Sequence, residues 1–395
     1  MAPALAVAGE LRAEGAEVTF IGGQRAEAQL VPEAGYELRT LTVEGVSRAN
    51  PLRAARALTR AALAVPRARA ILKEVRPDAV MGGGGYVTAP VGLAALSLGV
   101  PLVLTEADSH LGLANRLLAR RAHAVCLALP IPGREDAHED AGRAPVGRYA
   151  SRKGSRRQAR YRLTGRPIPV PDADRASARE WLGIAQGGTC VLVFGGSLGA
   201  RSINQAAIEG LAGLVGPPPI PAGAGPPTIA ESTEPGWGPA GAAMTGGRGV
   251  VRILHVAGRR DYPELSRHEL PPRYDLREYL DLEEFAKALA ASDLVVARAG
   301  GSVAEIAAYG KPAILVPYPY ASADHQSANA RWMEQASAAV TITDAELSAD
   351  RLRHEVQALL DDPEQMEAMA KASLSLARPN AAREIARELL EAAGA

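Results

Sequence analysis

The sequence predicts an α/β protein made of two doubly wound domains, each with a parallel β-sheet between layers of helices. Short runs rich in Val, Ile and Leu alternate with longer helical patterns, an alternation typical of parallel sheets that are covered on both faces. The runs form two blocks of similar size, and 395 residues are enough for two domains of ordinary size. The strand-like runs are residues 17–21, 79–81, 101–104 and 124–127 in the first block, and 190–194, 251–256, 294–297 and 313–316 in the second.

Composition and charge exclude several functional classes. With 47% hydrophobic and 22% charged residues, the chain resembles soluble globular enzymes rather than disordered or fibrous proteins. Lys and Arg together number 44, as do Asp and Glu, so no net charge attracts nucleic acid, and we expect no nucleic-acid partner. Cys126 and Cys190 lie far apart in strand-like runs, which fits neither a disulfide framework nor a zinc site. We expect both to be buried thiols in a reducing compartment.

Neither a secretory signal nor a membrane span is evident in the sequence. Met1 leads directly into a helical pattern, without a basic start and a cleavage site. The longest uncharged stretch, residues 79–105, contains four consecutive glycines and two prolines. These breaks predict a strand, a loop, a helix and a strand instead of a membrane-spanning helix.

The domain boundary falls in residues 130–171, a segment rich in Arg, Gly and Pro that shows no convincing periodicity. Residues 217–249 are dense in Pro, Gly and Ala, and we expect a disordered surface insertion there. The predicted divisions are an N-terminal domain over 1–135, a linker over 136–165, a C-terminal domain over 166–362 and closing helices over 363–395.

Two glycine turns in the second block each join a buried strand to a helix. The first, Gly195-Gly196-Ser197-Leu198-Gly199, offers backbone N–H groups and a positive helix end to a diphosphate, although a tight turn without a ligand is the simpler interpretation. The second, Gly300-Gly301-Ser302, places Glu305 in the first turns of a helix. A carboxylate there can bind ribose hydroxyls or complement the helix dipole, and the residues alone leave both interpretations open.

Polar side chains also follow other predicted strands at their carboxyl ends, where open parallel sheets bind ligands. After the last strand-like run, Gln326 and Asn329 provide mixed donors and acceptors of the kind that sugar hydroxyls need, next to Asp324, which can cap a helix. In the first block, a solvated loop with a capping Asp is the alternative to a binding site. The candidate residues there are Gly82 to Gly85 with Tyr86, and then Glu106, Asp108, His110 and Asn115.

Five segments, in this order and with suitable spacing, resemble the MurG family: GGGGYVTAP, TEADSHLGLANRLLA, FGGSLGARSIN, RAGGSVAEIAAYGKPAILVPYP and DHQSANA. The resemblance implies a GT-B fold, with two Rossmann-like domains facing a cleft and C-terminal helices tying them together. It also implies an inverting glycosyltransferase of peptidoglycan synthesis. N-acetylglucosamine would pass from UDP-N-acetylglucosamine to the C4 hydroxyl of a lipid-linked MurNAc-pentapeptide, without a metal or another cofactor.

The same resemblance implies roles for individual residues. The diphosphate would contact Gly195, Gly196, Ser197, Gly199 and Ser302, the ribose Glu305, and the donor sugar Gln326 and Asn329. Tyr86 and Asn115 would line the acceptor side. Asp108 is the first candidate for the base, followed by Glu106 and His110. Where the family has a TGNPVR-like run whose arginine meets the diphosphate, this chain has Pro169, and Arg166 is the candidate substitute.

The sequence departs from the family at its start, because members normally begin with a strand and a GGTxGH loop before a segment like residues 2–6. A truncated or misassigned start is the expected explanation. Two alternatives therefore stay open: a GT-B transferase with another acceptor, and an inactive UDP-sugar-binding protein.

A lipid-linked acceptor implies a peripheral protein on the cytoplasmic face of the cell membrane. Residues 51–69 carry five arginines and an apolar stripe, as in helices that lie on an anionic membrane surface. A helix that packs its apolar side on the first domain is the alternative.

Overall fold

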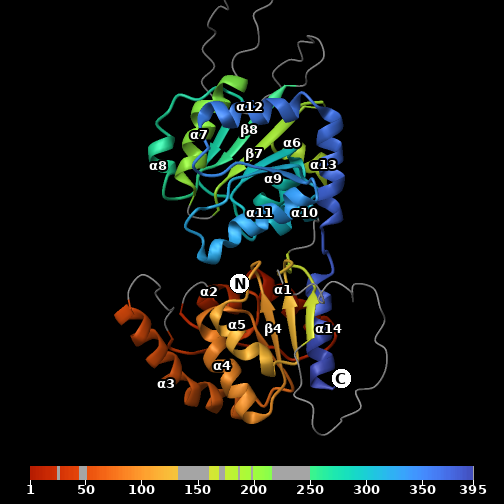
Figure 1. The fold of residues 1–395 in the computed structure, drawn as a ribbon. Coiled ribbons are helices and arrows are strands. Elements are labelled where there is room, and N and C mark those ends of the chain that lie inside the picture. Colours follow the sequence, from red (N-terminus) through yellow and green to blue (C-terminus); the bar gives the residue numbers. More distant parts are fainter. Residues whose placement is uncertain are drawn as a thin grey trace, which may run out of the picture. The chain divides into compact units, whose positions relative to one another are not determined.

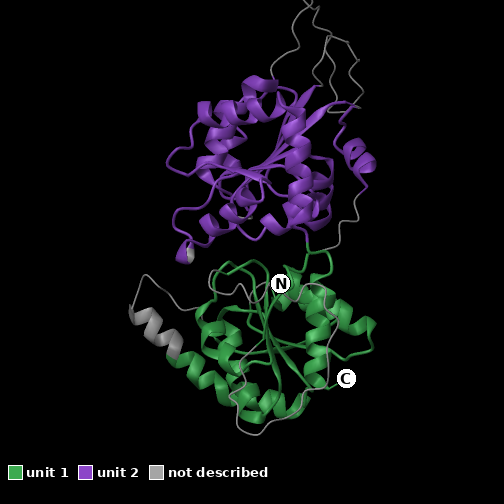
Figure 2. Cartoon of the chain, turned by 45° about the vertical axis from the view of Figure 1, so that its right-hand side comes forward, with its two compact units in different colours: residues 1–170, 378–395 green, residues 171–377 purple. Residues whose placement is uncertain are grey.

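The computed structural model describes residues 1–24, 27–43, 51–131, 160–168, 174–185, 187–196, 199–215 and 250–394, without the side chains of 51–58 and Ser322. The chain forms two compact units (Figure 2). Unit 1 comprises residues 1–170 and 378–395, and unit 2 comprises residues 171–377. These limits differ from the predicted divisions at 135, 165 and 362. The predicted insertion at 217–249 lies outside the described residues.

Unit 1 contains parallel sheets with helices on both faces (Figure 1). Strands β1 and β2 pair with each other, and a separate four-stranded sheet has the order β3-β4-β5-β6. The elements are α1 (Ala2–Ala13), β1 (Thr19–Gly22), α2 (Glu27–Glu33), β2 (Glu37–Thr40), α3 (Pro51–Val75), β3 (Val80–Gly82), α4 (Gly85–Leu98), β4 (Leu102–Glu106), α5 (Leu113–Leu118), the 3₁₀ turn η1 (Ala119–Arg121), β5 (Ala124–Leu127), β6 (Arg160–Leu163) and α14 (Ala381–Ala393).

The core of unit 1 follows the two-residue period of its strands. Leu102, Leu104 and Val125 point to one face and pack with α3, α4 and α5. Val103 and Cys126 point to the other face, which α1 and α14 cover. Helix α14 therefore belongs to the core of unit 1, although it follows all of unit 2 in the sequence.

Strand β6 lies inside the segment predicted as a linker, and that part of the prediction was wrong. Its sequence, Arg-Tyr-Arg-Leu, alternates two cations with two apolar residues. Arg160 and Arg162 form ion pairs with Glu388 of α14, at 2.7 and 3.2 Å. The sequence pattern of this segment was interpreted as a loop because the glutamate that pairs with its arginines lies more than 200 positions further along the chain.

Unit 2 contains a six-stranded parallel sheet with the order β12-β11-β10-β7-β8-β9. The chain runs outward from β7 to β9 and then continues on the other side of β7, so the strand order reverses between β7 and β10. The elements are α6 (Arg175–Trp181), β7 (Thr189–Phe194), α7 (Arg201–Leu211), the 3₁₀ turn η3 (Ala212–Val215), β8 (Val251–Val256), α8 (Tyr262–Leu265), β9 (Tyr274–Arg277), α9 (Leu282–Ala291), β10 (Leu294–Ala297), α10 (Val303–Ala308), β11 (Ala313–Leu315), the 3₁₀ turn η4 (Ser322–Asp324), α11 (His325–Gln335), β12 (Ala339–Thr341), α12 (Ala349–Leu360) and α13 (Pro363–Ser375).

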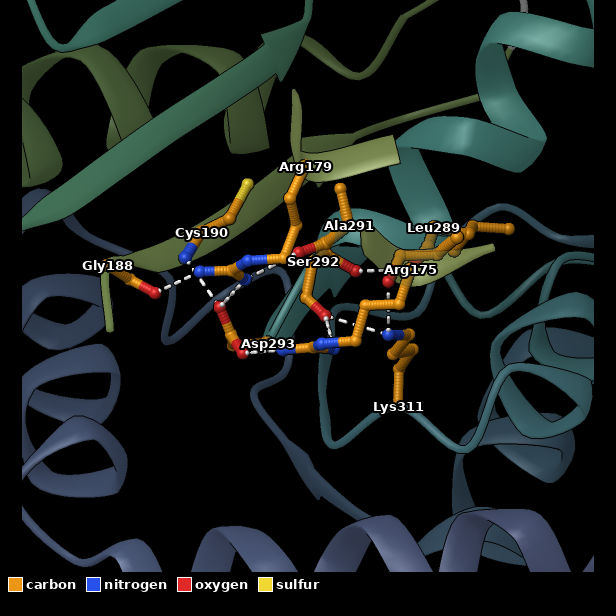
Figure 3. Close-up of polar contacts among 10 residues, drawn as sticks. Arg175, Arg179, Gly188, Cys190, Leu289, Ala291, Ser292, Asp293 and Lys311 are labelled. Atoms are coloured by element: carbon orange, nitrogen blue, oxygen red, sulfur yellow. Dashed lines mark hydrogen bonds and ion pairs between the residues drawn. The ribbon is translucent and has the colours of Figure 1, made fainter. Parts of the chain in front are cut away.

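The amino ends of β7 and β10 are held by a charged cluster, which we call the amino-edge cluster: Arg175, Arg179, Asp293 and Lys311 (Figure 3). Asp293 accepts a hydrogen bond from the Cys190 N–H at 2.8 Å and forms ion pairs with both arginines. Lys311 donates to the carbonyl oxygens of Ala290 and Ser292, at 3.0 and 2.8 Å, just where α9 ends. Burial lowers the pKa of Lys311 to about 8.

The two-domain α/β architecture with parallel sheets confirms the predicted fold class. Both cysteines are free and buried. Within the described part of the chain, no helix is long and apolar enough to cross a bilayer.

Candidate active site

The turn after β7 lies at the carboxyl edge of the unit 2 sheet, where the strand order reverses. Doubly wound sheets bind their ligands at such a point. Gly196 and Gly199 have φ angles of +91° and +80°, which favour glycine. A Cβ on Gly195 would collide with Ala200, and one on Gly199 with the carbonyl oxygen of Ala257. Backbone geometry therefore accounts for the three glycines, while Ser197 and Leu198 lie outside the described residues.

A buried polar network supports this turn, and the sequence patterns did not predict it. The Asn204 side chain on α7 donates to the carbonyl oxygen of Ala257 at 2.9 Å and to Asp261 at 3.0 Å. Its Oδ1 atom therefore accepts from His255 Nε2 at 3.0 Å, which fixes the tautomer of the imidazole. His255 Nδ1 then accepts from the Tyr274 hydroxyl at 2.9 Å. Burial lowers the pKa of His255 to about 3, so the network holds a neutral imidazole.

The second glycine turn follows β10 and lies beside the first. Phe194 and Ala297, the last residues of β7 and β10, are paired in the sheet. Ser302 and Glu305 are both half-buried, and Glu305 lies in the first turn of α10, as predicted. The side chain of Arg298 is buried at the start of this turn. The sequence patterns did not predict its role, because its contacts come from three other segments.

Gln326 and Asn329 connect α11 to these turns. Gln326 Oε1 accepts from the Tyr318 N–H at 2.9 Å, after β11. Asn329 is fully buried and donates to the carbonyl oxygen of Ala299 at 2.9 Å, within the β10 turn. Its Oδ1 atom has no hydrogen-bond partner among the described residues. A buried acceptor without a hydrogen bond costs about 1–3 kcal/mol of folding free energy. A ligand hydroxyl that donates to this Oδ1 atom would remove that cost.

In unit 1, the glycine run after β3 forms a tight entry to α4. Gly84 and Gly85 have φ angles of +78° and +75°, and a Cβ on Gly82 would lie 2.7 Å from Leu104. Tyr86, the second residue of α4, donates its hydroxyl hydrogen to Glu27 at 2.8 Å. Glu27 also accepts from the Gly23 N–H at 2.9 Å, so this tyrosine links α4 to the segment after β1.

The loop after β4 is organised around Glu106, which is 8% exposed. One carboxylate oxygen accepts from the Ala107 N–H at 3.1 Å, and the other accepts from Gly112 N–H at 2.7 Å and from Asn115 Nδ2 at 2.9 Å. Asn115 also donates to the carbonyl oxygen of Thr105, and its buried Oδ1 has no hydrogen-bond partner in the described part of the chain. Glu106 therefore shapes the loop with both of its oxygens.

Asp108 and His110 are the half-exposed titratable groups of the same loop. A carboxylate oxygen of Asp108 and a ring nitrogen of His110 lie within 4.8 Å of each other. Arg166 lies in unit 1, whereas the sequence placed it at the start of the C-terminal domain. Burial, and next the charge of Arg166, lower the pKa of the Met1 amino group.

Comparison with known proteins agrees with this arrangement. Residues 1–127 match the glycosyltransferase family 28 N-terminal domain, and residues 190–388 match the family's C-terminal domain. A protein of Moorella thermoacetica is 37% identical over 98% of this chain and 95% of its own length. A protein of Acidithiobacillus ferrooxidans is 37% identical over 99% of this chain and 94% of its own. Both are named UDP-N-acetylglucosamine--N-acetylmuramyl-(pentapeptide) pyrophosphoryl-undecaprenol N-acetylglucosamine transferase.

The fold also matches a solved structure. The crystal structure of MurG from Acinetobacter baumannii aligns with a TM-score of 0.68 and 24% identity, over 98% of this chain and 95% of the other. Together with the sequence relatives, it confirms the predicted resemblance to the MurG family. The chain belongs to glycosyltransferase family 28.

Proposed function

We propose that this chain transfers N-acetylglucosamine from UDP-N-acetylglucosamine to the C4 hydroxyl of MurNAc in an undecaprenyl-pyrophosphoryl-MurNAc-pentapeptide, with inversion at the anomeric carbon. The observation that carries the proposal is the identity of 37%, over nearly full length, to proteins named for this reaction. The glycine turns at the reversal of the strand order support it, because a nucleotide diphosphate binds at such turns.

The donor half fits a diphosphate as the leaving group. The turns after β7 and β10 each lead into a helix, so backbone N–H groups can stabilise the charge that develops as UDP departs. Ser197 and Ser302 would add hydroxyl donors. Glu305 would bind the ribose, and Gln326 and Asn329 the sugar. The Ala299 carbonyl oxygen orients the amide of Asn329, whose Oδ1 atom is left to accept from a sugar hydroxyl.

The acceptor half supports Asp108 as the base that takes the proton of the C4 hydroxyl. Both oxygens of Glu106 already accept hydrogen bonds from the loop, which suits a structural carboxylate better than a base. Asp108 is half-exposed, so its carboxylate can take a proton from an acceptor hydroxyl. A ring nitrogen of His110 lies within 4.8 Å of that carboxylate. Tyr86 and Asn115 would line the acceptor side.

A membrane-facing surface on α3, α4 and α5 fits a lipid-linked acceptor. Leu63, Leu113 and Leu117 are 72%, 57% and 61% exposed, and α4 contacts both α3 and α5. Exposed arginines lie close to these leucines in the sequence, and exposed apolar and basic side chains together favour an anionic bilayer surface. The arginines are Arg67, Arg69, Arg116, Arg120 and Arg121.

A transfer assay tests the proposed reaction. The purified chain is incubated with labelled UDP-N-acetylglucosamine and a short-chain lipid-linked MurNAc-pentapeptide, and the disaccharide product is measured. Product supports the proposal. Donor binding without product with this acceptor contradicts it, and turnover of other acceptors then separates a different transferase from an inactive UDP-sugar-binding protein.

Vesicle sedimentation tests the membrane surface. Replacing Leu113 and Leu117 by Glu should release the protein from anionic phosphatidylglycerol vesicles. Leu282→Glu, at a position in unit 2 that is 66% exposed, is the matched control and should leave binding unchanged. Equal binding by all three proteins would refute this assignment.

A further inference from the structure

One buried cation connects four segments at the carboxyl edge of the unit 2 sheet. Arg298 is 9% exposed and directly follows β10. Its guanidinium donates to the carbonyl oxygens of Val316 and Pro317, at 3.1 and 3.2 Å, in the segment after β11. It also donates to Asp344, after β12, at 2.6 Å, and to the hydroxyl of Ser202, on the first turn of α7, at 2.7 Å.

Ser202 and Asp344 close this arrangement into a triangle. The Ser202 hydroxyl donates to the Asp344 carboxylate at 2.7 Å and accepts from Arg298, so its hydrogen and one lone pair are both used. The carboxylate in turn neutralises the guanidinium. We call Ser202, Arg298 and Asp344 the edge triad.

The edge triad links the two turns that would hold the diphosphate. Arg298 begins the turn after β10, and Ser202 is the second residue of the helix that follows the turn after β7. The strand order reverses between these two strands. The pairing of β7 with β10 ends at Phe194 and Ala297. Beyond these residues, the hydrogen bond from Arg298 to Ser202 connects the two chain segments.

We propose that the edge triad is a positioning device for the donor diphosphate. This inference rests on the proposed function and adds residues that neither the motifs nor the resemblance assigned. The triad holds the first turn of α7 to Arg298, the residue that begins the turn after β10, so that the backbone N–H groups of both glycine turns face one pyrophosphate. Arg298, Ser202 and Asp344 are thus positioning residues.

The amino-edge cluster provides a matched control within the same strand. Asp293 directly precedes β10, as Arg298 directly follows it, and it also joins arginines to neighbouring segments. Asp293→Asn and Asp344→Asn each remove one carboxylate charge from an arginine-containing cluster. The first acts at the amino ends of the strands and the second at the carboxyl ends. A general loss of stability in unit 2 would affect both variants alike.

The experiment measures UDP-N-acetylglucosamine affinity by isothermal titration, together with donor KM, acceptor KM and thermal unfolding. Ser202→Ala and Asp344→Asn should each weaken donor binding about tenfold, as expected for the loss of one or two charge-assisted hydrogen bonds. Acceptor KM should not change. Ser202→Thr retains the hydroxyl and should bind within about twofold of the unaltered chain, while Asp293→Asn should unfold earlier yet bind the donor normally.

Three results would overturn the inference. Tighter donor binding by Asp344→Asn would show that the carboxylate acts only through its charge, which opposes that of the donor. Equal weakening by Asp293→Asn and Asp344→Asn would show a general effect of stability. The unaltered chain tests the proposed function separately: if it binds no UDP-sugar, both proposals fail, whereas donor binding that these variants leave intact rejects the edge triad alone.

Discussion

Replacing His255 by Gln should remove much of the acid sensitivity of unit 2. Burial lowers the pKa of His255 from 6.5 to about 3, so the folded chain keeps a neutral imidazole while the unfolded chain takes up a proton below pH 6.5. The unfolded state therefore binds more protons in this range. The stability that this group contributes is complete above pH 6.5 and is lost as the pH falls toward 3.

The size of the effect follows from these two pKa values. Lowering the pH from about 7.5 to about 5 should remove about 2 kcal/mol from the free energy of unfolding through this single group. At pH 5 the result hardly depends on the folded pKa, because an imidazole with a pKa well below 5 stays neutral in the folded state. A glutamine amide retains a donor and an acceptor for Asn204 and Tyr274 but does not titrate.

Urea unfolding at both pH values measures this difference. Trp181 and Trp332, the tryptophans among the described residues, belong to unit 2, so their fluorescence reports its unfolding. Tyr274→Phe is the control: it should lower stability by about 1 kcal/mol at both pH values and retain the loss on acidification. If His255→Gln lost as much stability between the two pH values as the unaltered chain, the assignment would be wrong.

Three further substitutions test other parts of the structure. Gly199→Ala should reduce both donor affinity and stability, because φ is +80° and the added Cβ would meet the Ala257 carbonyl oxygen; an unchanged titration with UDP-N-acetylglucosamine would contradict this. As the pH rises from about 8 to about 10, the free energy of unfolding of the unaltered chain should increase by about 2 kcal/mol, and Lys311→Met should abolish this increase. The gain arises because the unfolded chain binds more protons than a folded lysine with a pKa of about 8, and urea titrations of both proteins would detect it. Asp108→Asn should lower kcat about 10²- to 10⁴-fold without changing donor affinity, and a near-normal kcat would exclude Asp108 as the base.

The strands that sequence patterns predicted are those with continuous apolar runs. β7, β8 and β10 are buried on both faces, and their composition alone identifies them. β6 was missed because its two arginines are balanced by Glu388 on a distant helix. β9 was missed for a similar reason, since Asp275 and Arg277 pair with each other at 2.8 Å on the strand itself.

The candidate site also combines local features that the sequence predicts with distant contacts that it does not predict. Glycine turns are local features of the sequence, so their positions after β7 and β10 could be predicted. The groups that fix these turns are not local: Arg298 contacts Asp344, and His255 contacts Asn204 and Tyr274. The apolar run around His255 predicts a buried strand, but nothing in that run identifies the partners of the imidazole. Only the fold brings its partners within hydrogen-bonding distance.

The position of α14 in unit 1 sets an order for biosynthesis. Unit 2 is one continuous segment, whereas the sheet face formed by Val103 and Cys126 needs Ile385 and Leu389 to be covered. At about 5–20 residues per second, translation of the roughly 200 residues of unit 2 takes about 10–40 s. During that interval the part of this apolar face that α14 covers remains open on the nascent chain. A chaperone that binds exposed strands should therefore find its target in the half of the protein that is synthesised first.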